Sequence, residues 1–489
     1  MAPLRSARAR ARFMDVSFLM VRSILLAALL SLAATPASAL PLALFPSTFG
    51  DGTQVDTAVL GNRIPVVFVH GLGGGSDGWN SILRAYEQNP AWRGAFKPYS
   101  FNYPSTQTEV TADPTAPRTL TALGAALRDF MQGYYDEPMS APDFGFGNKR
   151  VIIVAHSMGG LVARSMMQEH VFRDGQRGGQ KVLHLITLST PHHGTQLSDA
   201  AVQLGLQTVS EIGNGYSGFV AQTTWTNFDG LDMSGGQCNP WLAQLNNYAP
   251  STGAVYGRCG SVPANPLPGY YNKIIAYGAS HLQSPDLQFG TGVFKPGSST
   301  SLLPSYLYLH GDTPGGLSRT YQNDGITPMV SAQFTGATVW QRAEAFDCDH
   351  RYMKDGYPEF VRSATATYTD LAFCAGTGSG ASYASGVSGG FAVSGSILGV
   401  PGGIMETIKN VSQIERVFNW GEQAYASYLQ PAGATSDIWN GFYYRYYPST
   451  NFYVGVKDGN VYYQGPTDSQ PVLIATLANF LAQAQAAGF

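Results

Sequence analysis

The segment that most constrains the fold is one in which a buried strand turns sharply into a helix. Residues 150–155 (Arg-Val-Ile-Ile-Val-Ala) are rich in β-branched apolar side chains, which is typical of a strand buried on both faces. The helical spacing that follows predicts a helix over 158–171. Between them lies Ser157, with the small residues Ala155 and Gly159 two positions before and after it. A serine on so tight a turn is exposed at the end of its strand, where a base can activate its hydroxyl, so we predict that Ser157 is a nucleophile.

Strands and helices alternate along most of the chain. Continuous apolar runs predict further buried strands at 64–69, 182–188, 273–277 and 339–346, and residues 120–134 have helical spacing. Strands separated by helices predict a parallel sheet covered on both faces. We therefore expect an α/β fold, doubly wound and mostly parallel, over residues 40–374.

A glycine-rich loop follows the first of these strands, at residues 70–75 (His-Gly-Leu-Gly-Gly-Gly). A hydrolase with a serine nucleophile needs backbone N–H groups in such a loop to stabilise the developing oxyanion. We expect these donors to be the N–H groups of Leu72 and Met158. The alternative is a phosphate-binding loop, but the lysine that such a loop requires does not follow the glycines.

Together with residues 188–195 (Leu-Ser-Thr-Pro-His-His-Gly-Thr), these two segments resemble those of secreted bacterial triacylglycerol lipases and carboxylesterases of the α/β-hydrolase superfamily. The resemblance covers about residues 60–370, with Ala155 in place of the first glycine of the G-x-S-x-G pattern. It implies that an acid lies between the serine and the catalytic histidine in the chain. His192 and His193 follow the serine by one strand only, so we interpret them as loop-orienting residues.

The resemblance also indicates the acid and the base. Residues 321–332 (beginning Tyr-Gln-Asn-Asp-Gly) resemble the segment that carries the acid in these lipases, which implies Asp324. His350 is the one histidine after Asp324, and it follows the last predicted strand. Its imidazole would take the proton of the serine while the carboxylate fixes its tautomer. The rival pair, Asp286 with His310, lacks this context of a strand followed by a loop. Some relatives bind calcium through an aspartate two positions after the base, but Tyr352 stands there, and we expect no metal and no cofactor.

The amino-terminal segment predicts an export signal over residues 1–39. Five arginines precede an eleven-residue apolar run at 24–34, and small residues follow up to Ala39. Because a membrane-spanning helix needs roughly 20 apolar residues, we expect cleavage near Ala39 and a secreted chain, extracellular or periplasmic, without a transmembrane segment.

The 29 Lys and Arg against 32 Asp and Glu leave no basic excess, which argues against nucleic acid as a partner.

All four cysteines lie beyond this cleavage position. An even number in an oxidising compartment favours two disulfides, for which three connectivities exist. We expect the pairs that are near in sequence, Cys238–Cys259 and Cys348–Cys374.

Two further segments are defined by composition. Residues 196–250 are a long insertion with apolar side chains such as Leu204, Leu206 and Val209, either a lid over an acyl-chain groove or a fixed cap. Residues 375–403 contain ten Gly and six Ser without a charged residue, which predicts a flexible linker. Residues 404–489 then predict a small α+β accessory module with an amphipathic helix, an aromatic hairpin at 441–463 and a terminal helix at 471–486.

These features predict a secreted serine ester hydrolase, a lipase that forms an acyl-enzyme on Ser157. No cluster of charged residues near the motifs indicates an ionic substrate, so we expect a neutral ester with a hydrophobic acyl chain, triacylglycerols first, met at a lipid–water interface. Short-chain carboxylesters are the second expectation and an insoluble polyester the third. A binding protein that keeps the hydrolase scaffold without catalysis remains the alternative from another class.

Overall fold

The computed structural model describes residues 42–72, 74–105, 109, 115–137, 145–147, 149–195, 240–246, 267–280, 309, 322–346, 349–350, 353–354, 376–377, 399–439 and 442–489. Three predicted segments therefore lie wholly or mostly outside the described residues. They are the export signal at 1–39, the lid at 196–250 and the linker at 375–403.

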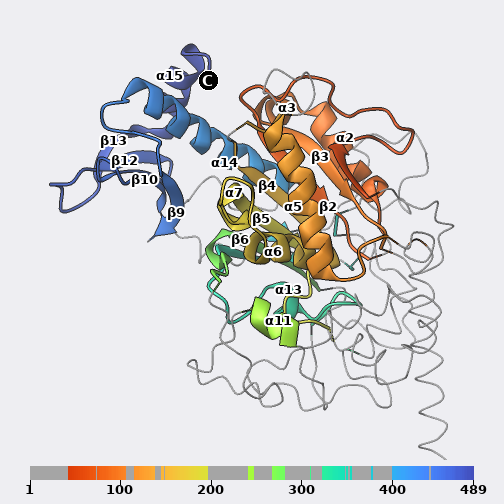
Figure 1. Ribbon diagram of the computed structural model, residues 1–489. Coiled ribbons are helices and arrows are strands. Elements are labelled where there is room, and N and C mark those ends of the chain that lie inside the picture. The colour runs from red at the N-terminus through yellow and green to blue at the C-terminus, as the bar shows by residue number, and fades with distance from the viewer. Residues whose placement is uncertain are drawn as a thin grey trace, which may run out of the picture.

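Within the described residues, the larger of two sheets has eight strands in the order β1-β3-β2-β4-β5-β6-β7-β8 (Figure 1). The strands are β1 (Ala43–Pro46), β2 (Ile64–Val69), β3 (Phe96–Asn102), β4 (Val151–His156), β5 (Val182–Leu188), β6 (Ile274–Ser280), β7 (Gln341–Phe346) and β8 (Gly376–Thr377). β1 and β8 run antiparallel to their neighbours, and the strands between them pair in parallel. The doubly wound, mostly parallel sheet predicted from the sequence is confirmed.

Helices cover both faces of this sheet. The helical segments are η1 (Ser76–Trp79), α2 (Asn80–Gln88), α3 (Pro90–Ala95), α5 (Leu120–Asp136), α6 (Met158–Glu169), α7 (Gly178–Lys181), α11 (Pro240–Leu245), η3 (Tyr271–Lys273), α13 (Met329–Ala332) and α14 (Gly399–Ala424). Side chains of a strand alternate between the faces, so Val67 and Ile153 pack in the cluster with α5 and α6. Val66 and Ile152, one position earlier, belong to the cluster with α2, α3 and α14.

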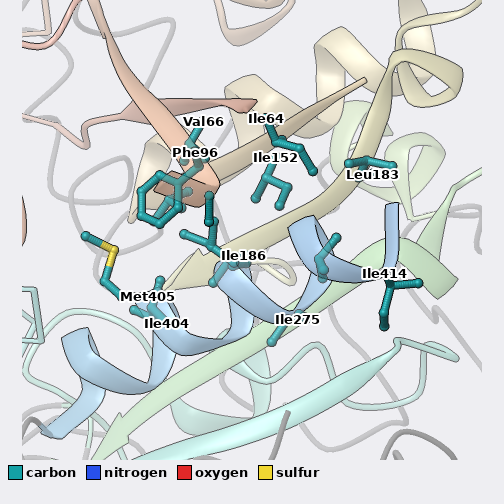
Figure 2. Close-up of a cluster of buried hydrophobic side chains, with 14 of the residues drawn as sticks. Ile64, Val66, Phe96, Ile152, Leu183, Ile186, Ile275, Ile404, Met405 and Ile414 are labelled. Carbon is teal, nitrogen blue, oxygen red and sulfur yellow. The ribbon is translucent and has the colours of Figure 1, made fainter. Parts of the chain in front are cut away.

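Helix α14 joins the two parts of the molecule. Figure 2 shows Ile404 and Met405 of this helix beside Phe96 and Ile186 of the large sheet, and all four side chains belong to one buried cluster. Trp92 of α3 donates a hydrogen bond to Glu406 at 2.7 Å. The helix that the sequence assigns to the accessory module therefore also completes the core of the large sheet, while a domain limit at residue 403 stays a prediction.

The smaller sheet is antiparallel and separate, with the strand order β13-β12-β11-β10-β9 (Figure 1). Its elements are β9 (Thr435–Trp439), β10 (Phe442–Tyr447), β11 (Phe452–Lys457), β12 (Asn460–Gln464) and β13 (Val472–Thr476), followed by α15 (Leu477–Ala486). The predicted aromatic hairpin matches β10, β11 and β12. The single terminal helix predicted at 471–486 differs from the structure, in which its first part is a strand. Val472 and Ile474 have β-branched side chains suited to pairing with β12, and Thr476 caps the helix that follows.

Among the described residues, no helix is long and apolar enough to cross a membrane.

Candidate active site

Ser157 lies on the turn between β4 and α6. Its backbone has φ 54° and ψ −130°, a conformation that residues with a side chain rarely adopt. The turn is held by a hydrogen bond of 2.8 Å from the N–H of Ser157 to the carbonyl oxygen of Leu188. This conformation places the hydroxyl at the carboxyl end of the parallel strands, as the strand-turn-helix pattern predicts.

Glycines allow the surrounding backbone to approach this turn closely. A Cβ added to Gly71 would lie 2.7 Å from the Cβ of Ser157, so the glycine-rich loop is in contact with the serine. A Cβ on Gly159 would lie 2.6 Å from the carbonyl oxygen of Val69, and one on Gly160 would lie 2.8 Å from the Cβ of Thr190. Each distance is shorter than van der Waals contact, so these positions exclude a larger residue.

The structure brings together Ser157, His350 and Asp324, which lie far apart in the sequence. Nε2 of His350 is 2.7 Å from Oγ of Ser157, and Nδ1 is 2.8 Å from Oδ2 of Asp324. Ser157 and His350 are each 7% exposed and Asp324 is fully buried. Because a carboxylate accepts hydrogen bonds, Nδ1 carries the proton and the lone pair of Nε2 faces the hydroxyl.

The surroundings of Asp324 favour its ionised form. Burial by itself raises the pKa of the carboxyl group, but His350, a hydrogen bond from Ser189 and the backbone N–H of Thr327 together keep the pKa below its ordinary value. Oδ1 accepts the N–H groups of Ile326 at 2.9 Å and Thr327 at 2.7 Å. The N–H of His350 also donates to the carbonyl oxygen of Asp324 at 2.9 Å. The carboxylate therefore keeps one oxygen for the imidazole.

The loop after β2 is shaped by His70. Its Nδ1 donates to the carbonyl oxygen of Gly71 at 2.9 Å, its Nε2 accepts the N–H of Tyr103 at 3.1 Å, and its ring stacks on that of Tyr103 with centroids 4.0 Å apart. Burial lowers the pKa of His70 to about 4, so the ring is neutral at neutral pH. His70 therefore fixes the backbone from which Leu72 follows.

His192 and His193 bond to the loops around the site. Nδ1 of His192 accepts from Arg164 at 3.2 Å, and Nε2 of His193 donates to the carbonyl oxygen of Thr335 at 2.8 Å. The backbone N–H of His193 also donates to Ser331 at 2.9 Å. These contacts join the loop after β5 to the segment that follows Asp324.

Comparison with known proteins agrees with the topology. Residues 61–214 match the family model of the PGAP1-like alpha/beta domain. The chain has an α/β-hydrolase fold. No functionally curated protein matches the chain at a significant level.

Three solved structures that are similar to this chain have low sequence identity to it. The mature form of Bacillus licheniformis lipase BlEst2 is 18% identical, with 66% of this chain and 97% of that chain covered and a TM-score of 0.39. Phospholipase PlaB from Legionella pneumophila is 14% identical, with 55% and 45% covered and a TM-score of 0.30. Aspergillus fumigatus lipase B is 16% identical, with 32% and 29% covered and a TM-score of 0.19.

The two expected oxyanion donors, Leu72 and Met158, lie next to the turn that carries Ser157. Met158 is the first residue of α6, where backbone N–H groups have no partner within the helix. Leu72 lies in the glycine-rich loop, next to Gly71 and its contact with Ser157.

The other expected site residues lie outside the described residues. They are the rival pair Asp286 and His310 and the four cysteines, Cys238, Cys259, Cys348 and Cys374. Within the part of the chain that the structure describes, no group of three or more His, Cys, Asp or Glu side chains is arranged to hold a metal ion.

Two residues near the candidate site, His156 and Lys354, are not given a role by the motifs of the sequence. His156 immediately precedes Ser157, and its Nε2 donates to the carbonyl oxygen of His350 at 2.7 Å. Nζ of Lys354 donates to the carbonyl oxygen of Gly78 at 2.6 Å, which joins the segment after His350 to η1. The sequence offered a signal for His156, which lies between Ala155 and Ser157 in the nucleophile motif, whereas no motif marks Lys354.

Proposed function

We propose that this α/β-hydrolase is a serine ester hydrolase that cleaves carboxylic esters of hydrophobic acyl chains through an acyl-enzyme on Ser157. The observation that supports it most directly is the unbroken chain of hydrogen bonds from the Ser157 hydroxyl through His350 to Asp324. A buried carboxylate, an imidazole of defined tautomer and a serine on a strained turn are together the arrangement that activates a hydroxyl for attack on an ester.

The proposed reaction has two halves. Oγ of Ser157 attacks the ester carbonyl while Nε2 of His350 takes its proton, and Asp324 stabilises the imidazolium that forms. The N–H groups of Leu72 and Met158 would stabilise the oxyanion of the tetrahedral intermediate, each contributing about 3 kcal/mol. The intermediate collapses when the imidazolium returns its proton to the leaving alcohol. A water molecule, deprotonated by the same imidazole, then releases the acid and restores the serine.

The substrate proposal follows from the chemistry of the sequence. The charged residues near the motifs do not indicate an ionic substrate, and the insertion at 196–250 carries apolar side chains such as Leu204, Leu206 and Val209. We therefore propose triacylglycerols as the preferred esters, bound at a lipid–water interface. We further propose that the chain is exported after cleavage near Ala39 and that its cysteines form disulfides in the oxidising compartment.

The test is a chain-length series of p-nitrophenyl esters, together with emulsified triacylglycerol, on the wild-type chain and Ser157→Ala. Ser165→Ala is the matched control, because Ser165 lies on α6 and its hydroxyl bonds to Glu169. We expect Ser157→Ala to lose at least about 10³-fold in kcat and Ser165→Ala to keep its rate. Activity that survives Ser157→Ala refutes the mechanism, and a strict preference for short acyl groups replaces the lipase by an esterase. Absence of turnover on every ester would favour the non-catalytic binding protein.

A further inference from the structure

His156 connects three parts of the candidate active site. It is the last residue of β4, directly before Ser157, and is 7% exposed. Its Nε2 lies 2.7 Å from the carbonyl oxygen of His350, and the two rings have centroids 4.9 Å apart. A Cβ on Gly71 would lie 3.2 Å from its Nδ1, so the ring also borders the glycine-rich loop.

The chemistry of the bond defines the state of this ring. A carbonyl oxygen only accepts hydrogen bonds, so Nε2 of His156 carries a proton. Burial and the nearby His350 and Lys354 lower the pKa of His156 well below its ordinary value, so the ring is neutral and Nδ1 is unprotonated. A neutral donor fixes the carbonyl without adding a positive charge beside the imidazolium that His350 would form in the reaction.

The bond completes the anchoring of the His350 backbone. The N–H of His350 donates to the carbonyl oxygen of Asp324 at 2.9 Å, and its C=O accepts from His156 at 2.7 Å. One backbone group of the base is thus held by the acid and the other by the residue next to the nucleophile. The separation of 2.7 Å between Nε2 of His350 and Oγ of Ser157 is therefore set from both sides.

We propose that His156 is a positioning residue of this hydrolase, which holds His350 at bonding distance from Ser157 through the His350 carbonyl oxygen. The inference rests on the proposed function, since it assigns a role in the same reaction. A shift of about 1 Å between reacting groups can cost on the order of 10²-fold in rate. The effect is expected in kcat, because the bond touches the base and leaves substrate binding unchanged.

Three variants separate the hydrogen bond from the volume of the ring. In His156→Gln the amide nitrogen reaches the place of Nε2, in His156→Asn it stops at the place of Nδ1, and His156→Leu has no donor. We expect the Asn and Leu variants to lose about 10- to 100-fold in kcat with KM within about twofold, and the Gln variant to stay within about threefold of wild type. His170→Leu is the control, since His170 also bonds to a backbone carbonyl, that of Thr121, but outside the site.

The measurements are kcat and KM on p-nitrophenyl esters, and the rate at which a fluorophosphonate labels Ser157. A folded Gln variant as slow as the Asn and Leu variants overturns the inference, and so do three variants that all keep the wild-type kcat. If the wild-type chain neither hydrolyses the esters nor reacts with the fluorophosphonate, the proposed function is refuted instead.

A spectroscopic readout needs no active variant. In spectra of the unsubstituted chain labelled with ¹⁵N-histidine, the ring signals absent from His156→Gln should show a neutral imidazole protonated at Nε2. A ring protonated at Nδ1 overturns the inference even where the Asn and Leu variants fail to fold.

Discussion

Replacing Ile404 tests whether helix α14 belongs to the core of the α/β-hydrolase sheet. Ile404 is fully buried, in the cluster that contains Phe96 and Ile186 (Figure 2). Ile404→Ala removes three carbon atoms, which at about 0.8 kcal/mol each is about 2.4 kcal/mol of transfer free energy. The cavity left behind adds to this, so we expect the free energy of unfolding to fall by about 3 kcal/mol, within the 2–5 kcal/mol typical of such replacements.

The assay is urea unfolding of the full chain, followed by tryptophan fluorescence and by hydrolysis of a p-nitrophenyl ester. Trp92 is a suitable reporter because it packs in the same cluster and bonds to Glu406 of α14. Gln413→Ala, at a half-buried position of the same helix, should change the free energy of unfolding by less than about 0.5 kcal/mol. The reasoning is refuted if Ile404→Ala lowers the free energy of unfolding by an equally small amount. It is also refuted if the variant shifts the unfolding transition seen by fluorescence but leaves the loss of ester hydrolysis at the wild-type urea concentration.

Two further predictions follow from the site. The pKa of buried His70 is about 4 in the folded chain and about 6.5 when unfolded, so the unfolded chain binds more protons between these values. The neutral state of His70 therefore contributes fully to the free energy of unfolding above pH 6.5, and about 3 kcal/mol of this contribution is lost as the pH falls toward 4. The free energy of unfolding measured across that range should fall for wild type and should fall less for His70→Asn. Gly159→Ala should abolish labelling of Ser157 by a fluorophosphonate, because its Cβ meets the backbone carbonyls of Val69 and His70, whereas Gly94→Ala, with open space around it, should label normally.

The central strands were predictable because they are buried on both faces and consist of apolar residues. β5 has the predicted bounds, and β4 lies one position later than the predicted strand, ending at His156. β3 was missed because Lys97 and Pro98 interrupt its apolar pattern. In the structure Nζ of Lys97 reaches the carbonyl oxygen of Ala58 at 2.7 Å, so this strand buries a lysine without burying an unpartnered charge. This hydrogen bond depends on a segment distant in sequence, so the local pattern of apolar residues does not predict it.

In the candidate site, too, local features could be predicted from the sequence and contacts between distant segments could not. The turn around Ser157 is local, since a strand, a helix and small residues within one segment indicate it. The choice of Asp324 and His350 came from chain order and resemblance, and the structure adds the distances that join them to the serine. The bond from His156 to the His350 carbonyl spans 194 positions of the sequence. The prediction of the catalytic residues brings the two segments together, but no pattern in either segment indicates this bond.

The role of the carboxyl-terminal sheet cannot be tested by cutting the chain in the predicted linker. Such a cut removes α14, whose buried apolar side chains cover one face of the hydrolase sheet. It also removes the partners of Arg150, which donates to Ser436 at 2.8 Å and lies 3.6 Å from Glu415. Arg445, paired with Glu415, is only 5% exposed, so the smaller sheet is joined to α14 by buried charges. Lost activity after truncation would therefore report unfolding of the hydrolase, and only substitutions of side chains on the exposed surface of the small sheet, such as Tyr453, can show whether that sheet acts on the substrate.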